Sequence, residues 1–178
     1  MRLASAVLVL LAPLAIVAQH KHAAPAAPQA QSPEASHHAY LEMERGAIER
    51  GEGFGMALAA DRNGFPGPKH ILELKAELQL TAEQQSAIEG LMAGMKQKAV
   101  AKGREALDAE KSLEAMFREG RTEAELRAET RRIAALRGEL RWVHLSAHLA
   151  AQKILTPAQN AKYQELRHGS AAHSHQMP

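Results

Sequence analysis

Two long runs of the chain carry apolar residues at the spacing of an α-helix. In the first run, the steps between apolar residues alternate near four and three, as in the seam of a coiled coil. Its stripe comprises Ile88, Met92, Met95, Ala99, Ala106, Ala109, Leu113 and Met116. The second stripe repeats every seven residues, with further apolar positions between, and comprises Leu126, Ile133, Leu136, Leu140, Val143, Ala147, Ala150 and Ile154. The pattern predicts two long helices, each with one apolar face.

Capping boxes mark where the predicted helices begin. In this motif, an N-cap Thr is followed three residues later by Glu or Gln, and each side chain bonds the other's backbone N–H. The boxes pair Thr81 with Gln84, Thr122 with Glu125, and Thr156 with Gln159. Gly120 ends the first long helix, and the connection to the second is short. The sequence therefore predicts an all-α fold, a long antiparallel helical hairpin with short flanking helices.

A hairpin of this length has more apolar surface than two helices can bury against each other. A flanking helix containing Ile71, Leu72 and Leu74 precedes the hairpin, and another begins at Pro157. These short helices cover part of the two stripes. Long thin hairpins of this kind usually bury the remainder against a second copy, so a homodimer is expected.

The N-terminus has the layout of a secretory signal peptide. Arg2 is followed by an uncharged, mostly aliphatic run from Leu3 to Ala18, with a suitable cleavage position before Gln19. The run is shorter than the roughly 20 residues that span a bilayer as a helix. We expect residues 1–18 to be removed and the mature protein to be periplasmic. The alternative is an uncleaved anchor, which would hold the chain at the membrane.

The segments on either side of the hairpin domain have a different composition. Residues 19–65 are rich in Ala, Pro, His and Gly, and we interpret them as a flexible region. Short helices are expected within it at 40–50 and 56–61, separated by a glycine-rich turn. Residues 66–168 form the predicted helical domain, and residues 169–178 a disordered tail that contains histidine.

The composition argues against several classes of function. The chain has no cysteine, which excludes disulfides, thiolate metal sites and cysteine nucleophiles. Its formal net charge is only +2, so nucleic acid is not an expected partner. His144 and His148 have the spacing of a zincin helix, but the glutamate that serves as general base in zincins is missing. No catalytic residue is identified, and we expect the protein not to be an enzyme.

Two of the capping boxes are preceded by leucine. Leu80-Thr81-Ala82-Glu83-Gln84 and Leu155-Thr156-Pro157-Ala158-Gln159 resemble the paired LTxxQ motifs of the Spy/CpxP family, which includes ZraP-like and CnrX-like proteins. The resemblance covers residues 69–167. It implies a curved helical-hairpin dimer in the periplasm. Members of this family act as ATP-independent chaperones, envelope-stress modulators or heavy-metal sensors.

Histidine and methionine side chains are predicted to gather at the open end of the hairpin. If the hairpin turns near Gly120, His148 lies level with Met92, and His144 with Met95. A fold-back at Thr81 brings His70 to the same level. Imidazole with thioether sulfur suits copper(I), nickel or cobalt, and a histidine-only subset suits zinc. His70, His144, His148, Met92 and Met95 are therefore the candidate ligands.

The resemblance adds to this interpretation of the histidines. CnrX-like sensors carry a histidine before the first motif and an i, i+4 pair before the second, and His70, His144 and His148 match that arrangement. This chain departs from it at Leu74, where a further histidine would stand. Alternatively, the methionines fill the core and the histidines are structural. Further histidines near the chain ends could hold metal loosely or be solvated: His20, His22, His37, His38, His168, His173 and His175.

A second candidate surface lies off the main apolar stripe of the second long helix. It comprises Arg137, Arg141, Trp142, Leu145 and Leu149. A mixed basic and apolar surface suits either an unfolded client or a second copy, although burial against the short helices would also explain these residues. The sequence thus favours a metal-responsive Spy/CpxP-type protein, with a chaperone lacking a specific metal site as the alternative. Partners would be unfolded or envelope proteins, or a membrane signalling protein.

Overall fold

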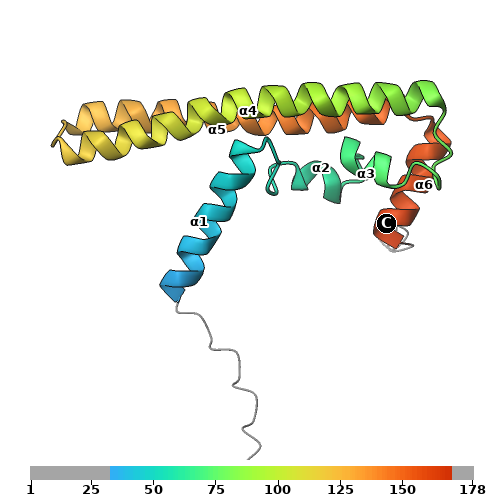
Figure 1. Cartoon of the computed structure of the whole chain (residues 1–178), viewed down its shortest axis with the longest axis horizontal. Coiled ribbons are helices and arrows are strands. Elements are labelled where there is room, and N and C mark those ends of the chain that lie inside the picture. The colour runs from blue at the N-terminus through green and yellow to red at the C-terminus, as the bar shows by residue number, and fades with distance from the viewer. Residues whose placement is uncertain (1–32, 170–178) are drawn as a thin grey trace, which may run out of the picture.

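The computed structural model describes residues 33–169 of the chain (Figure 1). The predicted signal peptide lies outside this range, as do His20, His22, His173 and His175. The described part contains α1 (Pro33–Glu49), α2 (Leu58–Arg62), α3 (Pro68–Glu73), α4 (Ala82–Arg118), α5 (Glu123–Ile154) and α6 (Pro157–His168). No strand occurs within it, and the predicted all-α class is confirmed.

The two longest helices, α4 and α5, pack side by side as an antiparallel hairpin (Figure 1). Gly120 adopts a φ of 67°, a left-handed conformation that glycine enters without steric cost, and the chain turns there. Thr81, Thr122 and Thr156 each accept a hydrogen bond from the backbone N–H three residues later. The three capping boxes are thus confirmed, together with the helix starts that they predict.

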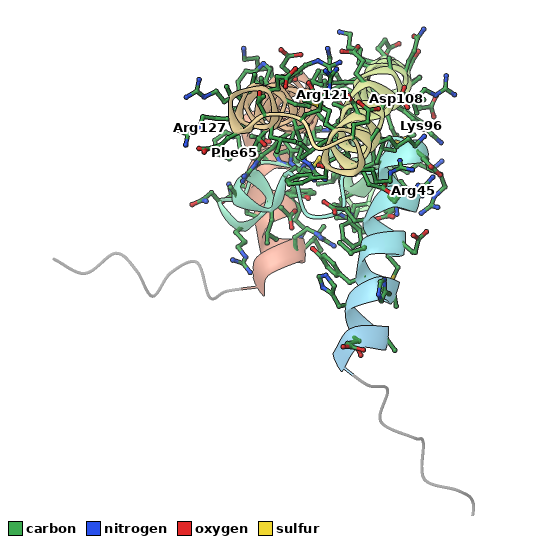
Figure 2. All side chains as sticks on the ribbon, turned by 90° about the vertical axis from the view of Figure 1, so that its left-hand side faces the viewer. Arg45, Phe65, Lys96, Asp108, Arg121 and Arg127 are labelled. Carbon is green, nitrogen blue, oxygen red and sulfur yellow. The ribbon has the colours of Figure 1, made fainter. Side chains whose placement is uncertain are left out.

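The remaining helices lie on one side of the hairpin. Viewed along the hairpin, α1 and α6 project away from it in the same direction (Figure 2). Helices α2 and α3 lie between them along the hairpin (Figure 1). Between its contact with the end of α1 and Gly120, the hairpin has no further described helix against it. Its buried positions on α4 and α5 are small or few, chiefly Ala106, Ala109 and Ile133.

The core is divided into two clusters. The larger cluster closes the open end of the hairpin, where Ile71, Leu78, Ile88, Ala151, Leu155 and Tyr163 come from the α3 region, α4, α5 and α6. The smaller cluster lies near the middle of the hairpin and joins Ile48 of α1 to Ala99 and Leu140. The short helices therefore cover parts of both apolar stripes, as the sequence predicts.

The chain between α1 and α3 follows the hairpin closely. Residues 44–67, called the strap below, include the end of α1 and all of α2. Helix α1 begins at Pro33, seven residues before the start predicted at Tyr40. Within the strap, Ala47, Ile48, Gly51, Gly64, Pro66 and Gly67 are buried. The glycine-rich turn is thus packed against the hairpin, because glycine lets the backbone approach α4 and α5.

Candidate functional site

His144 and His148 lie on the face of α5 that the strap covers. Their four-residue spacing places them one above the other on this face. His144 is 3% exposed and His148 is 9% exposed. A Cβ atom at Gly53 would lie 3.4 Å from Nδ1 of His144, and one at Gly67 would lie 3.0 Å from Cε1 of His148. Two strap glycines therefore let the backbone lie directly against the two rings.

His148 and His70 both lie close to Gly67, and each ring forms a hydrogen bond within the protein through its Nδ1 atom. Nδ1 of His148 donates a hydrogen bond to the carbonyl oxygen of Phe65 at 2.9 Å, and Phe65 lies alongside α5 (Figure 2). Nδ1 of His70 lies 2.8 Å from a carboxylate oxygen of Glu73, and this bond holds the pKa of Glu73 below its usual value. In the neutral form of each ring, the proton on Nδ1 leaves Nε2 as the nitrogen with a free lone pair.

The free edges of these two rings face the same backbone position. Nε2 of His148 would lie 3.1 Å from a Cβ atom at Gly67, and Cδ2 of His70 would lie 3.6 Å from it. Cδ2 is bonded to Nε2 within the imidazole ring. Because Gly67 has no side chain, space remains beside the Nε2 edge of the His148 ring and the Nε2 edge of the His70 ring.

His144 adds a third imidazole whose Nε2 atom has no partner. This atom is buried and forms no hydrogen bond with any described residue. Burial lowers the pKa of His144, and any positive charge on the nearby His148 ring lowers it further. The ring is therefore neutral at pH 7 and keeps a lone pair. Burying an unpaired polar nitrogen is costly unless a ligand or water satisfies it.

The three imidazole rings suit a transition metal of borderline softness, although their nitrogen atoms do not converge on one point in this structure. Imidazole suits zinc, copper, nickel and cobalt, and metal-binding histidines usually donate their other N–H to a carboxylate or a backbone carbonyl. His70 and His148 have such acceptors in Glu73 and Phe65. Within residues 33–169, however, no three side chains of His, Cys, Asp or Glu converge on one point as metal ligands would.

The two candidate methionines lie one turn apart on α4, and their surroundings differ. Met95 lines a groove of about 420 Å³ between α4 and α5, together with Gly90, Gly94, Val143 and Ser146. The strap instead contacts α4 at Lys96, Val100 and Gly103, which a 3.6-residue period places on another face. Met95 therefore does not lie on the face covered by the strap. Met92, four residues before Lys96, is half-buried on the strap side.

The residues of the predicted client or dimer surface do not all face the same way: the arginines contact the strap, and the large apolar side chains face solvent. Arg137 bridges Glu110 and Glu44 with hydrogen bonds of 2.9 Å and 3.1 Å. Nε of Arg141 donates to the carbonyl oxygen of Met56 at 3.1 Å. Both arginines thus hold the strap. Trp142 and Leu149 instead face solvent, with 57% and 38% exposure, and Leu145 is half-buried.

The two LTxxQ motifs meet at the open end of the hairpin. Nε2 of Gln84 donates to Oε1 of Gln159 at 2.8 Å, and Nε2 of Gln159 donates to Oε1 of Gln84 at 2.9 Å. The same amide groups donate to the carbonyl oxygens of Ile154 and Leu78. Leu155 is buried in the adjoining core, and Leu80 packs against it. The motif therefore fastens the start of α4 to the junction between α5 and α6.

Sequence reasoning missed this reciprocal pairing of Gln84 and Gln159. A signal was present, because both boxes use Gln whereas the box at Thr122 uses Glu125. An amide can accept from its N-cap backbone and also donate to a partner, but an ionised carboxylate can only accept. Also missed were Glu73 and Phe65, which orient two of the histidines. Glu73 was detectable from its i, i+3 spacing to His70.

Comparison with known proteins identifies the family. The family model described as "LTXXQ motif family protein" matches residues 67–167, more than half of the chain. Comparison with curated proteins and with solved structures gave no match. Among the described helices, none combines the length and apolar character needed to cross a bilayer. The matched region contains both motifs and the hairpin between them, and the chain belongs to the LTXXQ motif family, which is the Spy/CpxP-type family.

Proposed function

We propose that this protein is a periplasmic, metal-responsive member of the Spy/CpxP-type family. One observation carries the proposal: three imidazoles lie about the strap, and the Nε2 atoms of all three make no hydrogen bond among the described residues. Two of the three rings are already oriented through Nδ1, by Glu73 and Phe65. Imidazole rings that are oriented through Nδ1 and keep a free Nε2 are typical of metal ligands.

The periplasmic location rests on two supports. Residues 1–18 have the charge and apolar pattern of a signal peptide. Membership of a family that is typically periplasmic agrees with export. A homodimer is also part of the proposal, because the half of the hairpin nearest Gly120 buries few large side chains within one copy.

His70, His144 and His148 are the residues that would hold the metal. A bound Zn²⁺ or similar ion would supply a cross-link between imidazole nitrogens. His70 belongs to α3, and the other two belong to α5. Phe65 and Gly67 lie between these elements. Drawing the three rings together would therefore fix α3 and the end of the strap against α5, which is a change that a signalling partner could detect.

The test is calorimetric titration of the metal-free mature protein, from Gln19, with zinc, copper, nickel and cobalt. We expect binding at micromolar concentration or tighter for at least one of these metals. The double variant His144→Ala, His148→Ala should lose it and keep its helical circular dichroism. The double variant His37→Ala, His38→Ala is the matched control, because this pair is exposed on α1. Equal affinity of both double variants would disprove the site.

A second function, binding of unfolded clients, is favoured by a different observation. The only tryptophan of the chain, Trp142, is exposed on the same face of α5 as the exposed Leu149, two turns away. Large apolar side chains that face solvent close together often belong to binding surfaces. We expect a reduced, unfolded client to shift Trp142 emission to shorter wavelength. A Leu149→Ser variant should suppress client aggregation less well than the wild type, and unchanged suppression would argue against this surface.

A further inference from the structure

A notch in α4 accepts one side chain of the strap. Ile48 is 2% exposed and packs against Ala99 and Leu140, which are 0% and 1% exposed. A Cβ atom at Gly103 would lie 2.6 Å from Cγ2 of Ile48 and 3.1 Å from its carbonyl oxygen. The notch therefore exists because position 103 has no side chain, and its shape suits a branched aliphatic residue.

Charged groups beside the notch fix the orientation of the segment that enters it. Arg137 binds the carboxylate of Glu44, four residues before Ile48, and also binds the carboxylate of Glu110. Arg141 binds the carbonyl oxygen of Met56 further along the strap. The surface thus recognises a helical segment that carries a carboxylate four residues before a branched aliphatic residue. It also binds a backbone carbonyl oxygen further along the same segment.

The strap itself buries few side chains for its length. Apolar side chains remain exposed in the strap, at Phe54 and Leu58, and in the part of α1 that precedes it, at Tyr40, Leu41 and Met43. The ion pair between Glu44 and Arg137 is partly exposed, and such pairs contribute little. Ordering the glycines of the strap costs more backbone entropy than ordering other residues. Segments of this kind open locally at a small cost in free energy.

The boundary of the family match separates the notch from the strap. Residues 67–167 are matched, and they include Ala99, Gly103, Arg137, Leu140 and Arg141. The strap precedes them. The surface that receives Ile48 therefore belongs to the shared hairpin, whereas its occupant belongs to the part of the chain outside the match.

We propose that this face of the hairpin is a binding site for an amphipathic helical segment of another polypeptide, and that the strap occupies it in the resting protein. The partner segment carries a carboxylate four residues before a branched aliphatic residue, as Glu44 and Ile48 do. Release of the strap exposes Gly103, Arg137 and Arg141 together. This proposal does not depend on metal binding, and its test is made with a chelator present.

The test uses a fluorescent peptide of residues 33–50 and fluorescence anisotropy with the full chain. Ile48→Asp should release the strap and leave the notch intact. Met43→Asp, at an exposed position of α1, is the matched control. A site that the strap covers most of the time binds the peptide with a proportionally lower apparent affinity. We therefore expect the Ile48→Asp protein to bind the peptide at least about tenfold more tightly than the wild type or the control does.

Two further variants define the site. Gly103→Ala fills the notch and should prevent peptide binding, although it also displaces Ile48. A peptide with Ile48→Asp should not bind any of the proteins. If Ile48→Asp loses its helical signal, Glu44→Lys replaces it, because this change breaks the contact with Arg137 and leaves the apolar core intact. Equal peptide affinity for the wild type and the strap variants, or equal binding by Gly103→Ala, would overturn the proposal.

Discussion

At the scale of single residues, Gly67 leaves room for the His148 ring next to the strap backbone. Its φ of −80° and ψ of 142° are accessible to any residue, so glycine is not required there by the backbone. It is required by space, because a Cβ atom would contact the His148 ring at 3.0 Å. The requirement for glycine at this position is therefore linked directly to the candidate site.

Gly67→Ala should thus displace the His148 ring without straining the backbone. We expect a loss of about 1–2 kcal/mol of unfolding free energy, the usual cost of inserting a methyl group into a packed site, together with weaker zinc binding. Gly90→Ala is the control, because Gly90 lies within α4 and a Cβ atom there meets nothing within 4 Å. That variant should gain about 0.5–1 kcal/mol from helix propensity.

Urea denaturation of the two glycine variants, with and without zinc, separates these effects. A Gly67→Ala protein as stable as the wild type and with unchanged zinc affinity would show that the His148 ring can move without consequence. The space between His70 and His148 would then play no part in the site.

At the scale of helices, the two LTxxQ glutamines act as a pair. Each amide completes its own capping box and also donates to the other amide. Removing either glutamine therefore affects both helix starts. Glu125 occupies the same position in the box at Thr122, but it bonds only within that box and to Arg121.

Gln84→Ala and Gln159→Ala should be coupled in a double-mutant cycle. Each single change leaves the other amide half-buried with fewer partners, a cost of about 1–3 kcal/mol. The double variant should lose less than the two single losses combined, with a coupling of about 1 kcal/mol. Glu125→Ala combined with Gln84→Ala should be additive. Additivity in the cycle of the two glutamines would show that their pairing does not contribute to stability.

Sequence reasoning recovered the helices better than it recovered the site. Capping boxes are local, so Thr81, Thr122 and Thr156 mark helix starts without knowledge of the fold. The spacing of His144 and His148 is equally local. The position of the strap depends instead on contacts across long sequence separations, such as Ile48 with Gly103 and Phe65 with His148. An estimated register gives the level of Met95 along the hairpin, but not the direction in which its side chain leaves α4. The sequence therefore could not show that Met95 faces away from the strap.

At the scale of the whole molecule, the hairpin is stabilised unevenly along its length. The open end is fastened by the larger core cluster and by the two motifs. The middle is covered by the strap. The end near Gly120 depends on two helices whose buried contacts involve chiefly alanine. Among the described residues, His144 is the histidine whose pKa folding shifts, and it lies where the strap covers α5.

Stability of the metal-free protein should fall as the pH is lowered from about 7 towards 5, on either side of the ordinary histidine pKa of about 6.5. Burial, and then the charge of His148, lower the pKa of His144 in the folded state. Between the unfolded and folded pKa values, the unfolded chain binds a proton that the folded chain does not, so acidification favours unfolding. Carboxylates with lowered pKa values, such as Glu73 and Glu125, add to this loss only at lower pH.

The measurement is the urea midpoint at successive pH values with chelator present, for the wild type, His144→Gln and the exposed control His38→Gln. A smaller slope in His144→Gln alone is the expected result, because that variant has lost the proton-binding group whose pKa differs between the two states. Equal slopes in all three proteins would mean that His144 can be protonated in the folded state, and therefore that the strap does not keep this ring from water.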